Sequence, residues 1–163
     1  MTIKRVGLIG VGLMGHGIGK NILAKGFKLS VLAHRNRQPV DDLLAKGAKE
    51  ATSPKELAAS CDMVITVVGN SLQMEDIVRR ADGLIAGLKS GTIIADATTA
   101  QPESTIQLAA EIAAKGGRFV DIPMTRTPKE AEAGKLGLMT GGDKATLAEI
   151  QPVLECFADT IVH

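Results

Sequence analysis

The chain has no tryptophan and no tyrosine, and phenylalanine occurs only 3 times in 163 residues. Proteins that bind single-stranded nucleic acid usually stack bases on aromatic side chains, so this composition disfavours that class. The charge is also nearly balanced, and a formal net charge of +1 gives no long-range field to attract nucleic acid. We therefore expect no nucleic-acid partner, and any functional positive charge must be local.

Cysteine and long apolar runs are scarce as well. Cys61 and Cys156 lie far apart in apolar segments, where two cysteines more often pack as reduced thiols than form a disulfide. This usage is typical of a reducing compartment and predicts a cytoplasmic location. No stretch reaches about 18 uninterrupted apolar residues, the length that indicates a membrane-spanning helix. We predict no membrane partner and no metal site.

What the sequence does contain is an alternation of short, β-rich apolar runs with longer helical segments. This alternation is typical of parallel strands joined by helical crossovers, and the chain has the length of one domain. We predict an α/β fold, a doubly wound and mostly parallel sheet with helices on both faces. The expected strands are Ile3–Ile9, Leu29–Ala33, Met63–Val68, Thr92–Ala97, Arg118–Ile122, Leu136–Thr140 and a short terminal strand, Thr160–Val162.

Three of the expected helices carry start signals, in which serine or aspartate caps free amides or proline occupies the first turn. They span Lys55–Ser60 after Ser53-Pro54, Pro102–Lys115, and the segment from Asp143 through Cys156. In the second helix, the spacing of Ile106, Ala109, Ala110 and Ala113 predicts the face that packs on the sheet. In the third, Pro152 predicts a kink or an interruption.

Three glycines between the first strand and the first helix form the most informative motif. Gly10, Gly12 and Gly15 have the spacing and the strand-to-helix context of the dinucleotide fingerprint. The first permits a tight turn, the second admits a pyrophosphate, and the third lets the helix lie close to the strand. The alternative is a turn without a ligand. We predict that the pyrophosphate is bound by Gly10, Val11, Gly12, Leu13, Met14 and Gly15.

The residues after the second strand indicate which dinucleotide binds. A domain that binds NAD has an acidic residue about 20 positions beyond the loop to hold the ribose hydroxyls. Here the first acid is Asp41, and two arginines precede it. Guanidinium groups grip a 2′-phosphate, which a carboxylate would repel. We predict NADP(H) in preference to NAD(H), with contacts from His34, Arg35, Asn36 and Arg37. The alternative is a solvated loop, with cofactor choice set by shape.

Two further segments end later strands at the carboxyl edge of the expected sheet, where open parallel sheets bind ligands. The first is Val68-Gly69-Asn70, and the second is Thr98-Thr99. We predict that Val68, Gly69, Asn70 and Thr98 contact the cofactor and that Thr99 contacts the substrate. The alternative for each threonine is that it only caps the next helix.

Three motifs occur in order along the chain. The string from residue 7 to Gly15 is followed by Asn21, the second motif is Asp96–Pro102, and the third runs from Asp121 to Asp143. Together they resemble the β-hydroxyacid dehydrogenases, the family of 3-hydroxyisobutyrate dehydrogenase and tartronate semialdehyde reductase. The resemblance implies a Rossmann-type NAD(P)-binding domain over residues 1–163. It also implies hydride transfer between NADP(H) and a small β-hydroxy acid or its semialdehyde.

The third motif departs from the family at Thr125-Arg126-Thr127, where a serine and two glycines are usual. Glu130 also stands at a normally small position. A guanidinium can bind a carboxylate, phosphate or sulfonate. We therefore predict that Thr125, Arg126 and Thr127 bind the anionic group of a small-molecule substrate. The alternative is a surface ion pair between Arg126 and Glu130.

The resemblance also concerns segments beyond this chain. In the family, the general acid-base is a lysine on the following helix, and a helical C-terminal domain completes the substrate pocket and the homo-oligomer. That lysine would fall beyond His163, so we expect no catalytic residue here and a fragment of a longer dehydrogenase. Two alternatives stay open: a non-catalytic nucleotide-binding module, and a truncated product of a related phosphogluconate or imine reductase.

These expectations predict binding without turnover. A positioned proton donor contributes about 10²–10⁴-fold to such reactions. The 163-residue chain should bind NADPH, yet reduce small semialdehydes far more slowly than about 1 per second, the lower end of usual enzyme rates. The absorbance of NADPH, followed with a panel of semialdehydes, tests this. Turnover on the order of 1 per second or faster would contradict it.

Overall fold

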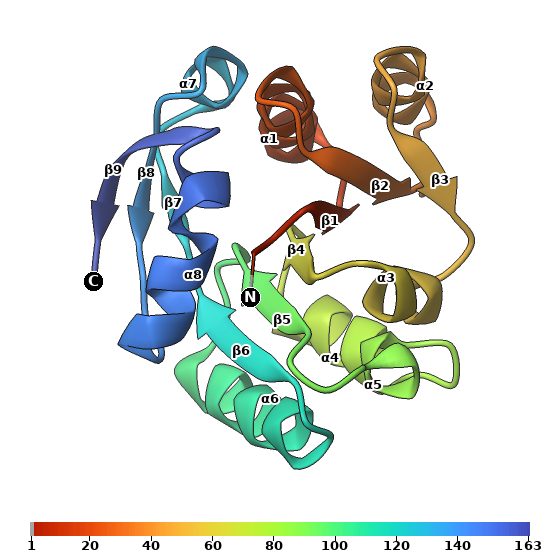
Figure 1. Ribbon diagram of the computed structural model, residues 1–163, viewed down its shortest axis with the longest axis vertical. Helices are drawn as coiled ribbons and strands as arrows, with labels where there is room; N and C mark the ends of the chain where they lie inside the picture. The colour runs from red at the N-terminus through yellow and green to blue at the C-terminus, as the bar shows by residue number, and fades with distance from the viewer. Residues whose placement is uncertain (1) are drawn as a thin grey trace.

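The computed structural model describes residues 2–163, so residue 1 of the predicted domain lies outside the described part. Its main sheet is parallel throughout and has the strand order β3-β2-β1-β4-β5-β6 (Figure 1). The doubly wound parallel sheet predicted from the sequence is confirmed. The strands are β1 (Arg5–Ile9), β2 (Lys28–Leu32), β3 (Lys49–Ala51), β4 (Met63–Thr66), β5 (Ile93–Asp96) and β6 (Arg118–Asp121).

Helices cover both faces of this sheet (Figure 1). Successive side chains of a strand point to opposite faces, so Ile93 and Ile94 belong to two different apolar clusters. The helices of one face are α1 (Leu13–Ala24), α2 (Gln38–Ala45) and α8 (Lys144–Leu154). Those of the other are α3 (Pro54–Ser60), α4 (Ser71–Arg79), α5 (Leu84–Gly87) and α6 (Pro102–Ala114).

The chain beyond β6 does not extend the main sheet. Pro123, which has no N–H to donate, follows β6, and a separate three-stranded sheet begins. The short strand β7 pairs antiparallel with β8, and β8 pairs parallel with β9. The last two strands were predicted, but their separation from the main sheet was not. The elements are β7 (Met124–Thr125), α7 (Pro128–Ala133), β8 (Leu136–Met139) and β9 (Ala158–Val162).

The predicted face of one helix was wrong, and the interruption allowed for in another does not occur. The predicted inner face of α6 is largely exposed, with Ile106 at 68%, and the helix buries Leu108 and Ile112 instead. The predicted face consists of one isoleucine and three alanines, and each alanine removes less apolar area from water than a leucine or an isoleucine does. Pro152 does not interrupt α8, which continues to Leu154. It stands in the last turn, so its missing N–H removes one helical hydrogen bond close to the point where the helix ends.

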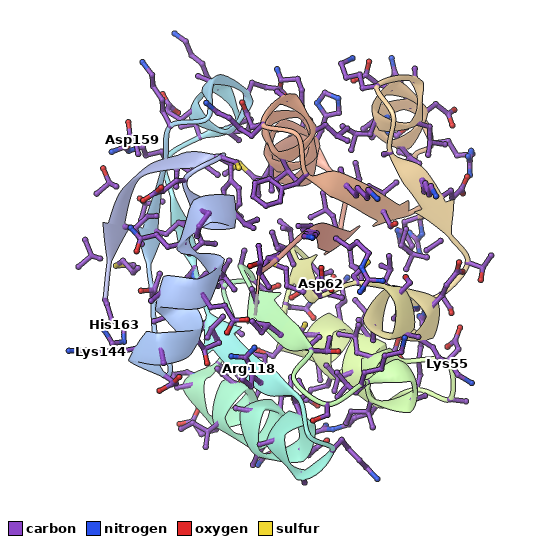
Figure 2. All side chains as sticks on the ribbon, viewed as in Figure 1. Lys55, Asp62, Arg118, Lys144, Asp159 and His163 are labelled. Carbon is purple, nitrogen blue, oxygen red and sulfur yellow. The ribbon has the colours of Figure 1, made fainter. Side chains whose placement is uncertain are left out.

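Polar contacts and close packing join the helices that follow β6, α7 and α8, to the main sheet and to α1. Arg118 of β6 lies 2.7 Å from Glu149 of α8 (Figure 2). Helix α1 packs so closely on α7 that a Cβ on Gly17 would lie 2.6 Å from the carbonyl carbon of Ala131. The amide group of Asn21 donates to the carbonyl oxygen of Ala131 at 3.0 Å. The helix that begins at the glycine loop is therefore fixed to the segment of the third motif.

Cys61 and Cys156 are buried free thiols, which confirms the prediction that they form no disulfide. Burial raises the pKa of both thiols, so the reactive thiolate is disfavoured. Within residues 2–163, none of the helices combines the length and the apolar character needed to cross a bilayer.

Candidate dinucleotide-binding site

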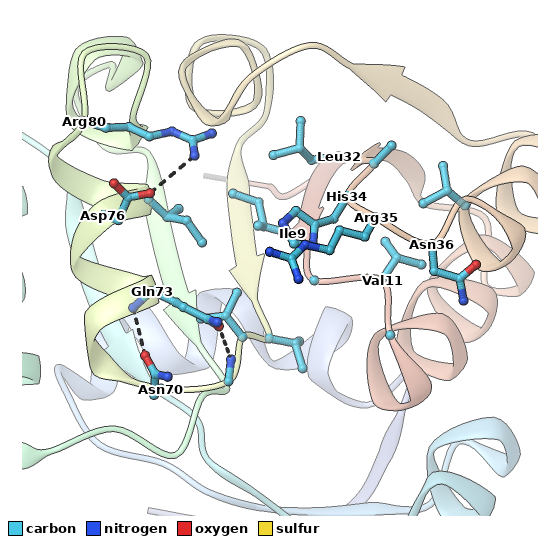
Figure 3. A pocket seen from close by; sticks show the side chains of 18 of the residues that line it. Ile9, Val11, Leu32, His34, Arg35, Asn36, Asn70, Gln73, Asp76 and Arg80 are labelled. Carbon is cyan, nitrogen blue, oxygen red and sulfur yellow. Dashed lines mark hydrogen bonds and ion pairs between the residues drawn. The ribbon is translucent and has the colours of Figure 1, made fainter.

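A cleft of about 900 Å³ opens at the carboxyl edge of the main sheet, between β1, β2, β4 and α4 (Figure 3). The chain runs from β1 outward to β2 and β3 and then returns to β4 on the other side of β1. Ligands of open α/β sheets bind at this kind of topological switch point. Among the residues predicted to bind the cofactor, those that line the cleft are Gly10, Val11, Gly12, His34, Arg35, Asn36, Val68, Gly69 and Asn70.

The surroundings of a side chain differ at each of the three glycines of the loop. Gly10 has φ +93°, and a Cβ there would overlap the carbonyl oxygen of Val67. A Cβ on Gly15 would overlap the carbonyl oxygen of Gly10. A Cβ on Gly12 would meet no atom within 4 Å, so it would project into open space. The first and third glycines allow the chain to pack, and the second leaves room for a ligand.

The start of α1 suits an anion. Gly12 is its N-cap, no side chain caps the helix, and its first turn has no acidic residue. Free N–H groups and the positive end of the helix dipole stabilise a phosphate at such a position. Leu13, Met14 and Gly15 form this first turn, directly after the residues that line the cleft. The loop therefore fits the diphosphate of a dinucleotide.

The two arginines after β2 differ in their surroundings. The guanidinium of Arg37 lies 2.9 Å from Glu50 and 3.1 Å from Asp41, and these hydrogen bonds raise its pKa. Arg37 does not line the cleft. Arg35 does, and no acidic side chain among residues 2–163 pairs with it (Figure 3). Of the two arginines, Arg35 is the one placed to meet a ligand.

Helix α4 forms a wall of the cleft that sequence reasoning missed. Leu72 lines it and is 75% exposed, which leaves an apolar surface that a ligand can cover. Arg80 lines the same wall, 2.9 Å from Asp82 and 3.4 Å from Asp76 (Figure 3). The available signal was that Leu72 is out of phase with the buried positions of its helix. No pattern in the sequence placed Arg80 opposite Arg35.

Thr98 and Thr99 do not line the cleft. Thr98 is 2% exposed, and its hydroxyl accepts a hydrogen bond from the amide of Val68 at 3.1 Å. Its own amide donates to Asp96 Oδ1 at 2.9 Å. Thr99, the next residue, is exposed. The hydroxyl of Thr98 therefore supports the wall of the cleft from behind.

Two carboxyl groups lie side by side near this point. Asp96 of β5 is the register partner of Asp121 of β6, so their side chains share one face of the sheet. Burial raises the pKa of Asp96, although hydrogen bonds from Thr98 and Thr66 oppose the shift. Burial and the charge of Asp96 raise the pKa of Asp121 to about 6. Sequence reasoning assigned this pair no role.

The predicted substrate residues lie on and after β7. Thr125 ends β7, and Thr127 is the N-cap of α7 with Glu130 completing a capping box. Between them, Arg126 has φ +80°, a conformation that favours glycine. Its guanidinium lies 2.6 Å from Asp159. The alternative of an ion pair between Arg126 and Glu130 is therefore wrong, because Glu130 caps the helix instead.

Comparison with known proteins agrees with this geometry. The chain matches the family described as the NAD binding domain of 6-phosphogluconate dehydrogenase over residues 5–163, and it belongs to that family. It is 36% identical over 151 residues to a probable 3-hydroxyisobutyrate dehydrogenase-like 2 of Arabidopsis thaliana, a match that covers 93% of this chain and 50% of that protein. The fold is that of an NAD(P)-binding domain, as the three motifs predicted.

Solved structures are similar over the same region. One described as Psf3 in complex with NADP+ and 2-OPP has a TM-score of 0.89 and 30% identity, covering 96% of this chain and 55% of that one. The 3-hydroxyisobutyrate dehydrogenase of Mycobacterium tuberculosis, with L-serine, has a TM-score of 0.90 and 26% identity, covering 100% and 54%. The chain spans about half the length of the curated relatives it matches.

The open space at Gly12 predicts a change in binding without a change in stability. We expect Gly12→Ala to weaken NADPH binding by at least about tenfold, because the new methyl group projects toward the phosphate site. Since it meets no atom within 4 Å, the free energy of unfolding should change by less than about 1 kcal/mol. Calorimetric titration and denaturant unfolding of one preparation measure both. Unchanged affinity would contradict the assignment of the loop.

The carboxyl pair predicts a pH dependence of stability. Folded Asp121 keeps its proton up to about pH 6, whereas an unfolded aspartate loses it near about pH 3.9. Between these values the folded chain binds more protons, so the free energy of unfolding falls as pH rises from about 4 to about 6. Asp121→Asn removes this term. The melting temperature of the variant, relative to the unaltered chain, should therefore rise over that range; a difference independent of pH would refute the prediction.

Proposed function

We propose that this chain is the cofactor-binding part of a dehydrogenase that transfers a hydride between NADP(H) and a small β-hydroxy acid or its semialdehyde. The observation that carries the proposal is the glycine loop: the main chain leaves no room for a Cβ at Gly10 and Gly15, and Gly12 borders open space that suits a diphosphate. The names of the relatives, which include several 3-hydroxyisobutyrate dehydrogenases, support the substrate class.

The residues around the cleft support NADP(H) in preference to NAD(H). The segment after β2 presents no acidic side chain to the cleft, and Arg35 is available there. Arg80 lines the opposite wall, and Asp76 beside it is already paired with that guanidinium. We propose that Arg35 binds the 2′-phosphate in bidentate fashion. Arg80 on the opposite wall is engaged by Asp82 and Asp76 and is assigned no contact with the phosphate. Arg37, which the sequence had also suggested, is engaged by Glu50.

The residues of this chain bind and orient, and the cofactor when bound supplies the hydride at its nicotinamide ring. We propose that main-chain amides of the glycine loop bind the diphosphate. Val68 and Asn70 form the border of the site on the side of α4. Thr99, exposed at the carboxyl edge, is available to a substrate oxygen. Arg126 can bind an anionic substrate if it exchanges Asp159 for the substrate's acid group. A lysine beyond His163 would supply the proton, as the family resemblance implies.

A nucleotide-binding module without turnover is the second candidate. It is favoured by one observation, that the guanidinium of Arg126 is engaged within the protein by Asp159. The two candidates differ once the C-terminal domain of a relative is supplied. Reduction of semialdehydes by that assembly supports the dehydrogenase, and NADPH binding without reduction supports the module.

The two arginines after β2 form a matched pair for testing cofactor preference. Arg35→Ala should weaken NADPH binding by at least about tenfold, equivalent to about 1.4 kcal/mol, while changing NADH binding by less than about threefold. Arg37→Ala, which removes a residue already paired with Glu50, should change neither affinity by more than about threefold. Dissociation constants for both nucleotides measure this. Equal effects of the two substitutions, or NADH bound as tightly as NADPH by the unaltered chain, would refute the preference.

A further inference from the structure

A short series of hydrogen bonds leads from a buried carboxyl group to the wall of the cleft. Asp96 is 1% exposed, and its Oδ1 accepts from the hydroxyl of Thr66 at 2.8 Å and from the amide of Thr98 at 2.9 Å. The hydroxyl of Thr98 in turn accepts from the amide of Val68 at 3.1 Å. Val68 lines the cleft and Asp96 does not. The carboxyl group therefore reaches the cleft through one threonine.

These side-chain hydrogen bonds join β4 and β5 at the point where the main-chain pairing of the two strands ends. The register of β4 with β5 runs to the pair Thr66 and Asp96, and the amide of Ala97 still donates to the carbonyl of Thr66 at 2.8 Å. After this point the segment that follows β4 leads to α4, and the segment that follows β5 leads to α6. The bond from Val68 to Thr98 joins them just beyond the last ladder bond. It lies next to Val67, whose carbonyl oxygen faces Gly10 of the loop.

The second carboxyl oxygen of Asp96 shows which atoms of this side chain are used for hydrogen bonding. Oδ2 is buried and has no hydrogen-bond partner among residues 2–163, and Asp121 lies beside it in the neighbouring strand. A buried carboxylate oxygen without a donor is costly, and burial accordingly raises the pKa of the Asp96 carboxyl group. What the position supplies to its neighbours is one oxygen, Oδ1, that accepts two hydrogen bonds. An asparagine would supply the same acceptor.

We infer that Asp96 is a positioning residue for the dinucleotide. By way of Thr98 it fixes the main chain at Val68 and so sets the width of the cleft. This inference rests on the proposed function, because the cleft has to bind the cofactor for its width to matter. Asp96 itself contacts neither cofactor nor substrate. Its influence is expected in the affinity for the dinucleotide more than in the stability of the sheet.

The same sheet offers a matched control at its opposite edge. Asp62, immediately before β4, is 9% exposed and also accepts main-chain hydrogen bonds, from Lys4 at 2.9 Å and from Arg5 at 2.8 Å (Figure 2). It is therefore a buried aspartate at the amino end of the strand whose carboxyl end borders the cleft. Losing it should destabilise the protein without altering the cleft.

The experiment is an NADPH titration of the unaltered chain, Asp96→Asn, Asp96→Ala and Asp62→Ala, with the melting temperature of each. We expect Asp96→Ala to weaken binding by at least about tenfold, because Thr98 and Val68 lose their anchor. Asp96→Asn should stay within about threefold of the unaltered chain. Asp62→Ala should lower the melting temperature and keep the affinity within about threefold. Unchanged affinity in Asp96→Ala, or an equal loss in Asp62→Ala or Asp96→Asn, would overturn the inference.

A second variant covers the case in which Asp96→Ala does not fold. Thr98→Val keeps the shape of the side chain and removes the acceptor of the Val68 amide, so NADPH binding should weaken by about fivefold or more. Thr98→Ser should restore it, and full affinity in Thr98→Val would overturn the inference. Hydrogen exchange at the Val68 amide, measured without nucleotide, should be faster in Thr98→Val than in the unaltered chain. If the unaltered chain binds neither NADPH nor NADH, the proposed function fails, and the exchange result separates the two failures.

Discussion

The structure depends on the close approach of main chains at the glycine loop. The turn at Gly10 lies against the carbonyl oxygen of Val67. Gly15, in the first turn of α1, lies against the carbonyl oxygen of Gly10. No side chain larger than hydrogen fits at either contact. Because of them, β1, α1 and the end of β4 meet at one point, where the strand order reverses and the free amides of a helix face open space. The position of the cleft and of these free amides follows from this one steric requirement.

The arrangement of charge matters more than its total. The chain is nearly neutral, and many of its arginines are engaged within the protein, such as Arg37 with Glu50 and Arg126 with Asp159. An exposed ion pair contributes little to stability, but it does decide which guanidinium is free for a ligand. Arg35 keeps that freedom because no acidic residue of the described chain forms an ion pair with it. The preference for NADP(H) that we propose rests on this difference between neighbouring arginines.

The main sheet and its glycine loop could be predicted from the sequence, because buried parallel strands and a strand-to-helix glycine turn leave strong local patterns. The edge strand β3 left none, since Lys49 and Glu50 are exposed. The separate second sheet also escaped prediction, because its first strand is only two residues long. The sequence also did not predict which side chains lie next to each other in the folded chain. The partners of Arg126, the position of Arg80 in the cleft and the neighbours Asp96 and Asp121 depend on segments that are distant in sequence.

The central claim is that the loop from Gly10 to Gly15 binds the diphosphate of a dinucleotide. Titration of NADP+ into the isotope-labelled chain, followed residue by residue through its amide resonances, tests it most directly. The account predicts saturable shifts that are largest in the loop, at residues 34–36 and at residues 68–73. An absence of saturable shifts, or shifts confined to the second sheet, would contradict it.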